Sequence, residues 1–586
     1  MLRFKHLILL SSPILFIFIG LFFTRNFIKN NFNYKPNDKY KLINNFSYEI
    51  KYSQGKILSK LSQKFNIKDE KEKVPKLIKY AFISAEDKRF FKHNGVDIFG
   101  STRAFINNIK SGYIREGGST ITQQASRLVF LNNEISITRK IKEIIISLIM
   151  DYKYSKNQIL KIYLNEIYLG EGARGINEAS QIYFGKLISE LTLSEVAMLA
   201  GLAPAPNFYS PYQNYDLAIQ RRDKILRLMY LEGYIDKLNY EKAVLEKIKV
   251  INKKNIQDKM LINFILTQVA NKISPEINYQ IDDHLIINTS IEKEWQNKAQ
   301  KLSQELLPEG LEVSLISIES DTGLIKAMIS GRYPEYNQFN RATSAFRPLS
   351  STFKIIPYCL ALLEGKNLLD TYDDAPTCWE DYCPKNFSNF YQGETTLIES
   401  FKNSSNIVPI KISYQFGLKK IVNLANKFGI KYKKELSSYL PIAIGAYGDS
   451  LLNITNAYSI INNKGQLIKP SVFTNIKSKE GKIIWENKFE TSKIIDRQIA
   501  NKLNYLLENS VEGGTGIAAS INGRKIFGKT GTSDLNKDLW FIGSIKNLTT
   551  GIWIGFDDNR ATNFSSGTSA NFWRRDILNQ LTYNQK

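Results

Sequence analysis

The chain has 586 residues, too many for a single hydrophobic core, and its hydrophobic fraction of 43% is ample for globular packing, which excludes wholesale disorder. Its 79 basic residues against 56 acidic ones give a formal charge of +23. This excess fits a nucleic acid, an anionic membrane surface or acidic substrates, but compositional bias in a chain rich in Lys, Asn and Ile explains it equally well, so charge alone selects no partner. Three histidines and three cysteines leave little material for a Ser-His-Asp triad, a histidine-rich zinc site or a disulfide framework.

The first element is an apolar run over residues 7–23, preceded by Arg3 and Lys5. Its length is close to the shortest that spans a bilayer, roughly 17–25 residues. No small-x-small cleavage site follows it, which favours an uncleaved anchor over a signal peptide. We therefore expect residues 1–25 to form a cytoplasmic tail and transmembrane anchor, residues 26–60 a polar stalk, and the rest of the chain to be exported.

Residues 61–240 have the pattern of an all-α domain. Apolar residues over 74–85 follow the i, i+3, i+4 spacing of a helix with one buried face. Ser155 with Gln158 makes a capping-box signal for another helix start. The apolar stripe that follows predicts a helix that continues to Gly170.

An ordered set of polar motifs lies within this helical part. Glu86 and Asp87 directly follow the first apolar run, and read singly such a pair is typical of a solvated helix end. A Gly-Gly-Ser-Thr loop, two glutamines and a group of cations around a second glutamate come next: Ser119, Thr120, Gln123, Gln124, Arg127, Arg139, Lys140 and Glu143. Lys140 and Glu143 are i and i+3 on one predicted helix, so they can share a face.

The second half of the chain has a different pattern. Residues 241–297 are charged and mixed and are interpreted as a linker. Over 298–586, β-rich runs alternate with helical stretches: residues 311–332 predict a hairpin around an Asp-Thr-Gly turn, and 539–545 and 551–556 predict two more strands. This alternation predicts an α/β domain with an antiparallel sheet.

Two cysteines lie close together in this domain. Cys378 and Cys383 bracket Trp-Glu-Asp-Tyr and could close a small loop in an oxidising compartment. Two free thiols in a surface loop fit the sequence equally well, so both alternatives stay open.

Three short motifs follow in order within the α/β domain: Ser351-Thr-Phe-Lys354, Ser404-Ser-Asn406 and Lys529-Thr530-Gly531-Thr532. Ser351 and Lys354 are one helical turn apart and share a face. A lysine amine in a closed, desolvated site has a lowered pKa and can take the serine proton. The first motif therefore predicts a nucleophile and its base without a histidine.

The other two motifs supply the remaining parts of an acyl-transfer site. Ser404 can relay a proton to a leaving group, and Asn406 can hold a substrate amide. Lys529 and the neighbouring hydroxyls suit a carboxylate, and Gly531 would let substrate backbone approach an edge strand closely. Backbone N–H groups near the nucleophile and Thr532 would form an oxyanion hole.

This trio resembles the transpeptidase domain of class A penicillin-binding proteins. The segments around it strengthen the resemblance: Phe339-Asn-Arg-Ala342, Gly528, Trp540-Phe-Ile-Gly543 and Trp553-Ile-Gly-Phe-Asp557. The resemblance implies that stem peptides ending in D-Ala-D-Ala acylate Ser351 with loss of D-alanine, and that β-lactams inhibit the reaction. Two positions depart from the usual pattern: Ser350 stands where the family usually has glycine, and Ile355 where it usually has proline.

The helical part resembles the peptidoglycan glycosyltransferases, glycosyltransferase family 51, over roughly residues 60–240, with His93 and a Tyr163-Leu-Asn-Glu-Ile-Tyr168 segment completing the motif set. The resemblance implies an all-α, lysozyme-like domain that polymerises glycan from lipid II. Glu86 would be the base that deprotonates the acceptor hydroxyl, since a carboxylate near apolar helix surface can have its pKa raised.

The same resemblance implies roles for the other motif residues. Arg127, Arg139 and Lys140 would bind the leaving pyrophosphate, with Arg127 where the family often has lysine. Glu143 would orient those cations, which we favour, or hold a divalent metal such as Mg²⁺. His93 would have a structural hydrogen-bonding role. The polar residues expected to bind substrate are Asp87, Ser119, Thr120, Gln123 and Gln124.

Together these features predict a bifunctional, single-pass enzyme of the cell inner (plasma) membrane, with both catalytic domains on the periplasmic side. Its partners would be lipid II, nascent glycan strands, stem peptides and cell-wall assembly proteins, with no nucleic acid and no cofactor beyond the possible metal. A D,D-carboxypeptidase or β-lactamase-like acyl hydrolase shares the serine trio, but the helical part argues against both. Intact motif residues argue against a non-catalytic scaffold or sensor.

Overall fold

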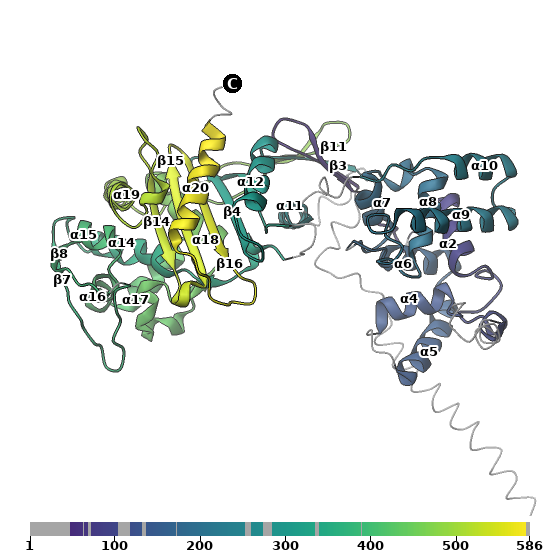
Figure 1. Ribbon diagram of the computed structural model, residues 1–586, viewed down its shortest axis with the longest axis horizontal. Helices are drawn as coiled ribbons and strands as arrows, with labels where there is room; N and C mark the ends of the chain where they lie inside the picture. Colours follow the sequence, from purple (N-terminus) through teal and green to yellow (C-terminus); the bar gives the residue numbers. More distant parts are fainter. Residues whose placement is uncertain are drawn as a thin grey trace, which may run out of the picture.

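The computed structural model describes residues 47–61, 64–67, 69, 72–103, 118–131, 136–171, 173–251, 259–272, 284–333, 339–387 and 389–581. The predicted tail and anchor, 1–25, lie outside these residues. Among the helices that are described, none combines the length and apolar character needed to cross a bilayer. Figure 1 shows a helical domain, an α/β domain and a small sheet (β3, β11) between them.

The N-terminal domain is helical, as the sequence predicts. Its main elements are α2 (Lys76–Glu86), α4 (Ile121–Phe130), α5 (Ile137–Lys153), α6 (Lys156–Glu166), α7 (Ile176–Phe184), η3 (Ile188–Glu190), α8 (Leu193–Leu202), α9 (Tyr215–Leu231) and α10 (Lys237–Leu245). Helix α8 is buried over Ser194–Leu202, all the way round, which is the pattern of a central helix. The other helices pack around the same hydrophobic core, which contains Phe82 and Tyr163.

The predicted capping box at the start of α6 is present. Gln158 N–H donates to Ser155 Oγ at 3.3 Å, and Ser155 N–H donates to Gln158 Oε1 at 2.9 Å. The helix ends at Glu166, however, four positions before the predicted stop at Gly170. The chain turns there because Leu169 N–H bonds to the Ala173 carbonyl at 3.0 Å instead of continuing the helical ladder.

The α/β domain is built on a five-stranded antiparallel sheet with the order β14-β15-β16-β4-β5. Its strands are β4 (Glu312–Glu319), β5 (Leu324–Ile329), β14 (Phe527–Thr532), β15 (Asp538–Ile545) and β16 (Leu548–Gly555). The predicted hairpin is thus β4–β5, and β16 begins three residues before the predicted 551–556 run. The motif strand β14 lies at the sheet edge, as expected.

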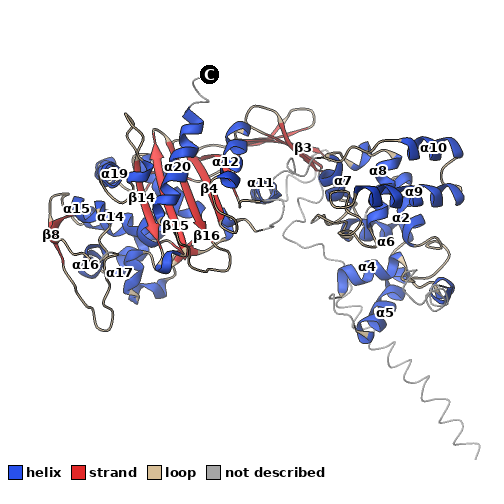
Figure 2. Cartoon of the chain, viewed as in Figure 1, coloured by secondary structure: helices blue, strands red, loops and turns tan. Residues whose placement is uncertain are grey.

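Helices cover both faces of this sheet (Figure 2). Side chains alternate along β15: Leu539 and Phe541 join a core with α12 (Lys293–Glu305) and α20 (Ser566–Leu581), and Trp540 and Ile542 face the other core. The second face holds the elements around the serine motifs: η6 (Ser350–Lys354), α14 (Ile355–Leu363), α15 (Leu397–Lys402), α16 (Ile407–Phe416), α17 (Leu418–Lys427), α18 (Leu451–Asn462) and α19 (Arg497–Glu512).

The segments expected to be stalk and linker contain regular structure. A second sheet has the order β12 (Ile483–Glu486), β11 (Phe473–Ser478), β3 (His284–Thr289), β1 (Ser47–Lys51) and β2 (Ile57–Leu61). Helix α11 (Lys259–Lys272) lies within the expected linker. Strands β1 and β3 pair in parallel, and both alternate buried with half-buried residues, so burial of one face explains why these short polar segments become strands.

Candidate active sites

Glu86 is the last residue of α2, a helix that buries Ile78, Ala81 and Phe82 against the core. Gln124 Nε2 donates to Glu86 Oε2 at 2.7 Å. The other oxygen, Oε1, is buried and has no hydrogen-bond partner within the described part of the chain. Burial raises the pKa of Glu86, which the Gln124 bond and nearby arginines oppose. The result is a carboxyl group with an unused oxygen and an increased affinity for a proton.

Asp87, Thr120 and Gln123 lie beside Glu86, but their side chains are engaged within the chain. Asp87 accepts from the Ile121 N–H and from His93 Nε2, both at 3.0 Å. Thr120 and Gln123 form the capping box of α4, and Thr120 Oγ1 donates to the Gly95 carbonyl at 2.6 Å. These contacts fix the end of α2 against the start of α4. They place Glu86 next to Gln124, and His93 contributes through its hydrogen bond to Asp87.

A second buried carboxylate, Glu143 on α5, gathers two cations. Arg139 Nη1 donates to Glu143 Oε2 at 2.6 Å, and Lys140 Nζ donates to Oε1 at 2.5 Å. Lys140 Nζ also donates to Ser119 Oγ at 2.9 Å. Both carboxylate oxygens of Glu143 therefore accept from cationic side chains.

Two residues near Glu86 have no counterpart among the predicted site residues. Arg221, on α9, lowers the pKa of Glu86 by its charge, as Arg127 also does. Tyr163, on α6, is fully buried with its hydroxyl unpartnered among the described residues, and the charge of Glu86 contributes to raising its pKa. Tyr163 belongs to the motif segment 163–168, which received no role of its own, whereas no local motif marks Arg221.

In the α/β domain, Ser351 and Lys354 lie on the 3₁₀ helix η6, where residues i and i+3 are aligned one above the other. Lys354 is fully buried. Its Nζ donates to Asn406 Oδ1 at 2.7 Å, to the Ser404 carbonyl at 2.8 Å and to Ser404 Oγ at 3.2 Å. Burial and the charge of Lys529 hold the pKa of Lys354 well below its usual range. The first two serine motifs therefore meet at this amine.

The third motif reaches the same place from the edge strand β14. Lys529 Nζ donates to Ser404 Oγ at 2.9 Å and to Thr515 Oγ1 at 3.3 Å. Burial lowers the pKa of Lys529 to about 7. Thr530 Oγ1 donates to the same Thr515 hydroxyl at 2.8 Å, so Thr515, which the motif analysis missed, contacts two residues of the third motif.

Gly531 lies close to another part of the chain. A Cβ on Gly531 would lie 2.9 Å from Thr352 Cγ2 and 3.1 Å from the Leu349 carbonyl oxygen. This close approach between β14 and the turn that carries Ser351 favours glycine here, and the expected approach of a substrate backbone stays a prediction. Thr532 ends the strand and is half-buried.

The two departures from the usual family pattern lie on either side of Ser351, one in η6 and one at the start of α14. Ser350 has a φ of 52°, in the left-handed region where a residue with a Cβ is strained. Its backbone is held there by Gly445, whose carbonyl accepts from the Ser350 N–H at 2.9 Å. This explains why glycine is usual at that position. Ile355 is fully buried at the start of α14.

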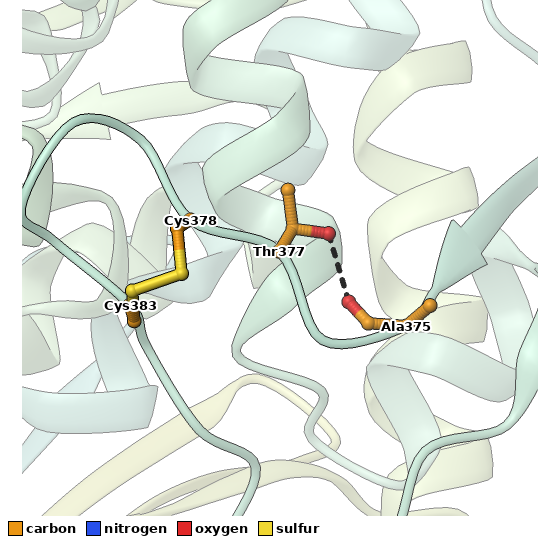
Figure 3. Close-up of a disulfide and its surroundings, with 4 residues drawn as sticks. All are labelled: Ala375, Thr377, Cys378 and Cys383. Carbon is orange, nitrogen blue, oxygen red and sulfur yellow. Dashed lines mark hydrogen bonds between the residues drawn. A yellow bond between two sulfur atoms is a disulfide. The ribbon is translucent and has the colours of Figure 1, made fainter.

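The alternative left open for the cysteines is decided by the structure: Cys378 and Cys383 form a disulfide, with an S–S distance of 2.04 Å (Figure 3). The short loop that it closes is a turn in which Trp379 and Tyr382 exchange two backbone hydrogen bonds. It lies between β7 (Thr371–Asp374) and β8 (Gly393–Thr396).

Two family models match the chain: Transglycosylase over residues 54–230 and penicillin binding protein transpeptidase domain over residues 313–575. The chain is 31% identical to penicillin-binding protein 1A of Aquifex aeolicus (strain VF5), a match that covers 83% of this chain and 79% of that protein. It is 30% identical to penicillin-binding protein 4 of Bacillus subtilis (strain 168), covering 83% of each.

The fold is also that of a solved structure. The crystal structure of penicillin-binding protein 1A from Haemophilus influenzae matches with a TM-score of 0.57 at 20% identity, over 91% of this chain and 92% of that one. The similarity to these relatives and to the solved structure extends across both the helical domain and the α/β domain.

Proposed function

The chain belongs to the class A penicillin-binding proteins, which join glycosyltransferase and transpeptidase activities in bifunctional peptidoglycan synthesis, and we propose that Glu86 and Ser351 are the centres of its two reactions. The observation that carries the proposal is a buried carboxyl group with an unpartnered oxygen in one domain, together with a buried lysine in the other. That lysine lies one helical turn from Ser351 and bonds to Ser404 and Asn406. The alternative of a simple acyl hydrolase is not favoured, because it leaves the helical domain without a role.

In the helical domain, the substrate is lipid II. Glu86 removes the proton from the acceptor sugar 4-hydroxyl, and the resulting oxygen attacks the donor anomeric carbon with inversion. The unpartnered Oε1 supports this role, since it is free to accept that proton. Arg139 and Lys140, held by Glu143, stabilise the pyrophosphate that leaves. Glu143 acts by orienting these cations rather than as a metal ligand.

The exposed face of α5 supports a substrate met at a membrane surface. Five large apolar residues, each about one helical turn after the one before, are exposed along one side of this helix: Ile137, Ile141, Ile145, Leu148 and Tyr152. An apolar stripe of this length is unfavourable in water and stable against lipid. Because Arg139 and Lys140 lie on the same helix, α5 would hold the pyrophosphate close to the bilayer in which the lipid tail remains. This fits a membrane-anchored, periplasmic enzyme.

In the α/β domain, Lys354 takes the Ser351 proton as Oγ attacks the carbonyl of the penultimate D-alanine. Backbone N–H groups near Ser351 and Thr532 stabilise the oxyanion, and Ser404 passes a proton to the departing D-alanine. Lys529 binds the terminal carboxylate. An amine of a neighbouring stem peptide then attacks the acyl-enzyme and completes the cross-link. A β-lactam inhibits this reaction by acylating Ser351 in place of the stem peptide.

Incubation of the purified protein with lipid II, with and without penicillin, tests both roles. Wild type should make cross-linked polymer, and penicillin should leave polymer without cross-links. Glu86→Gln should make no polymer but still bind fluorescent penicillin, and Ser351→Ala should do the reverse. Glu241→Gln and Ser344→Ala, exposed positions of the same types, serve as controls. Polymer from Glu86→Gln, or labelling of Ser351→Ala, would remove that residue from its role.

A further inference from the structure

The Ser405–Asn406 segment is held by two residues that belong to none of the three serine motifs. Asp374, the last residue of β7, accepts from Ser405 Oγ at 2.7 Å. Asn386 Oδ1 accepts from the Asn406 N–H at 2.8 Å. The two are also joined to each other, since Asn386 Nδ2 donates to both Asp374 oxygens at 3.0 and 3.1 Å. Both side chains are buried.

These contacts fix the direction of the Asn406 side chain. Asn406 Nδ2 donates to the Lys385 carbonyl, next to Asn386, at 2.7 Å. The amide oxygen is thereby turned toward Lys354 Nζ, which donates to it at 2.7 Å. Ser405 Oγ in turn accepts from the Ile407 N–H at 3.1 Å and caps the first turn of α16. The orientation of Asn406 beside the base thus depends on the residues around it.

Asp374 also acts on Lys354 through its charge. Burial lowers the pKa of Lys354 most, the charge of Lys529 on β14 lowers it further, and the charge of Asp374 on β7 raises it. The carboxylate favours the protonated amine, whereas the second ammonium opposes it. The proton affinity of Lys354 therefore depends on its burial and on opposing charges from two separate strands.

We propose that Asp374 and Asn386 are positioning residues of the transpeptidase site, which together orient Asn406 toward Lys354, while the Asp374 carboxylate sets the charge balance around that base. This inference rests on the role proposed for Ser351 and Lys354. The disulfide Cys378–Cys383 closes the middle of the segment that connects the two residues, so it limits how far Asn386 can move from Asp374 (Figure 3).

The test is the rate of acylation by a fluorescent penicillin, measured on the full-length protein across pH. Asp374→Asn keeps the shape of the side chain but removes its charge, so the pKa of Lys354 should fall. The acid limb, where the acylation rate drops at low pH because Lys354 becomes protonated, should therefore move to lower pH. Its plateau should also fall roughly tenfold, because a hydrogen bond to a charged group is lost. Asn386→Ala should lower the plateau without moving the limb. Asp373→Asn, at an exposed carboxylate on the same strand, should match wild type.

The possible outcomes distinguish the roles of Asp374 and Asn386 from the role proposed for Ser351. A purely structural role for Asp374 would reduce the active fraction equally at every pH, so an unmoved acid limb in Asp374→Asn would overturn the charge role. If that variant melts below the assay temperature, Asn386→Ala decides, and a wild-type plateau there would overturn the positioning role. Labelling of Ser351→Ala would instead overturn the proposed nucleophile, whatever the Asp374 result.

Discussion

Lys354 and Lys529 donate to one shared acceptor, Ser404 Oγ, at 3.2 and 2.9 Å. Two ammonium groups this close repel each other, and burial removes the water that would screen them. Burial lowers the pKa of Lys529 to about 7, and burial together with the charge of Lys529 holds the pKa of Lys354 well below its usual range. A lowered pKa makes Lys354 better able to accept a proton, as the base role proposed for it requires.

The first prediction concerns this pair. Lys529→Met removes the like charge that lowers the pKa of Lys354, so that pKa rises and more Lys354 is protonated at a given pH. The acid limb of penicillin acylation should then move to higher pH, opposite to the shift expected for Asp374→Asn. Acylation rates between about pH 5 and 9 measure it. A limb that moves down, or not at all, would mean that Lys529 does not control the base.

The second prediction concerns the strained turn before the nucleophile. Ser350→Gly should stabilise the α/β domain by about 1 kcal/mol, because glycine adopts a φ of 52° without the Cβ penalty. The melting temperature of the domain, followed by calorimetry, should rise while penicillin labelling stays. Ser350→Val, a β-branched residue at the same φ, should lower it. An unchanged melting temperature for the glycine variant would show that the strain is relieved in another way.

The third prediction separates internal packing from substrate approach at Gly531. Gly531→Ala places a methyl group 2.9 Å from Thr352 Cγ2, which should push β14 away from η6 and slow acylation by an order of magnitude or more, as an overpacked site costs about 1–3 kcal/mol. Thr352→Ser removes that Cγ2 and keeps the hydroxyl that donates to Leu349.

Adding Thr352→Ser to Gly531→Ala should therefore restore part of the lost rate. Thr352→Ser alone is the control, and it should acylate close to the wild-type rate. If the double variant is as slow as Gly531→Ala, the glycine is required by the ligand and not by the turn.

The fourth prediction tests the exposed face of α5. Ile141→Glu with Leu148→Glu places charge in the middle of the apolar stripe, so polymerisation of lipid II in vesicles should fall several-fold as membrane contact weakens. Penicillin labelling should not change. Leu238→Glu, at an exposed leucine on α10, controls for a new surface charge. Loss of activity to the same extent in detergent micelles and in vesicles would argue against a membrane role for this face.

Local signals explain what could be predicted from the sequence. The Ser155 capping box and the β4–β5 hairpin are encoded by residues within a few positions of each other, and both are present. The three serine motifs could be assigned because each is a short run of neighbouring residues that can be recognised in the sequence by itself. Their partners could not: Thr515, Asp374, Asn386 and Arg221 reach the sites from separate loops and helices, and nothing in their own neighbourhood marks them.

The missed strands have a related cause. Strand β1 is five residues long, and only Tyr48 and Ile50 of it are buried, too few to distinguish a strand from a polar segment with two apolar residues. Its partner β3 is more than two hundred residues away. Pairing of two strands so far apart in the chain depends on how the residues between them fold. A local sequence pattern carries no information about that.

Tyr48 and Ile50 belong to the same hydrophobic core as Phe353, in the helix of the nucleophile, although the whole helical domain lies between them in the chain. The helical domain is thus inserted into the α/β domain, which holds both ends of the insertion: β2 pairs with β1 where the chain leaves, and β3 pairs with β1 after it returns. The two segments that lead into and out of the helical domain therefore belong to one sheet, with β2 and β3 on either side of β1.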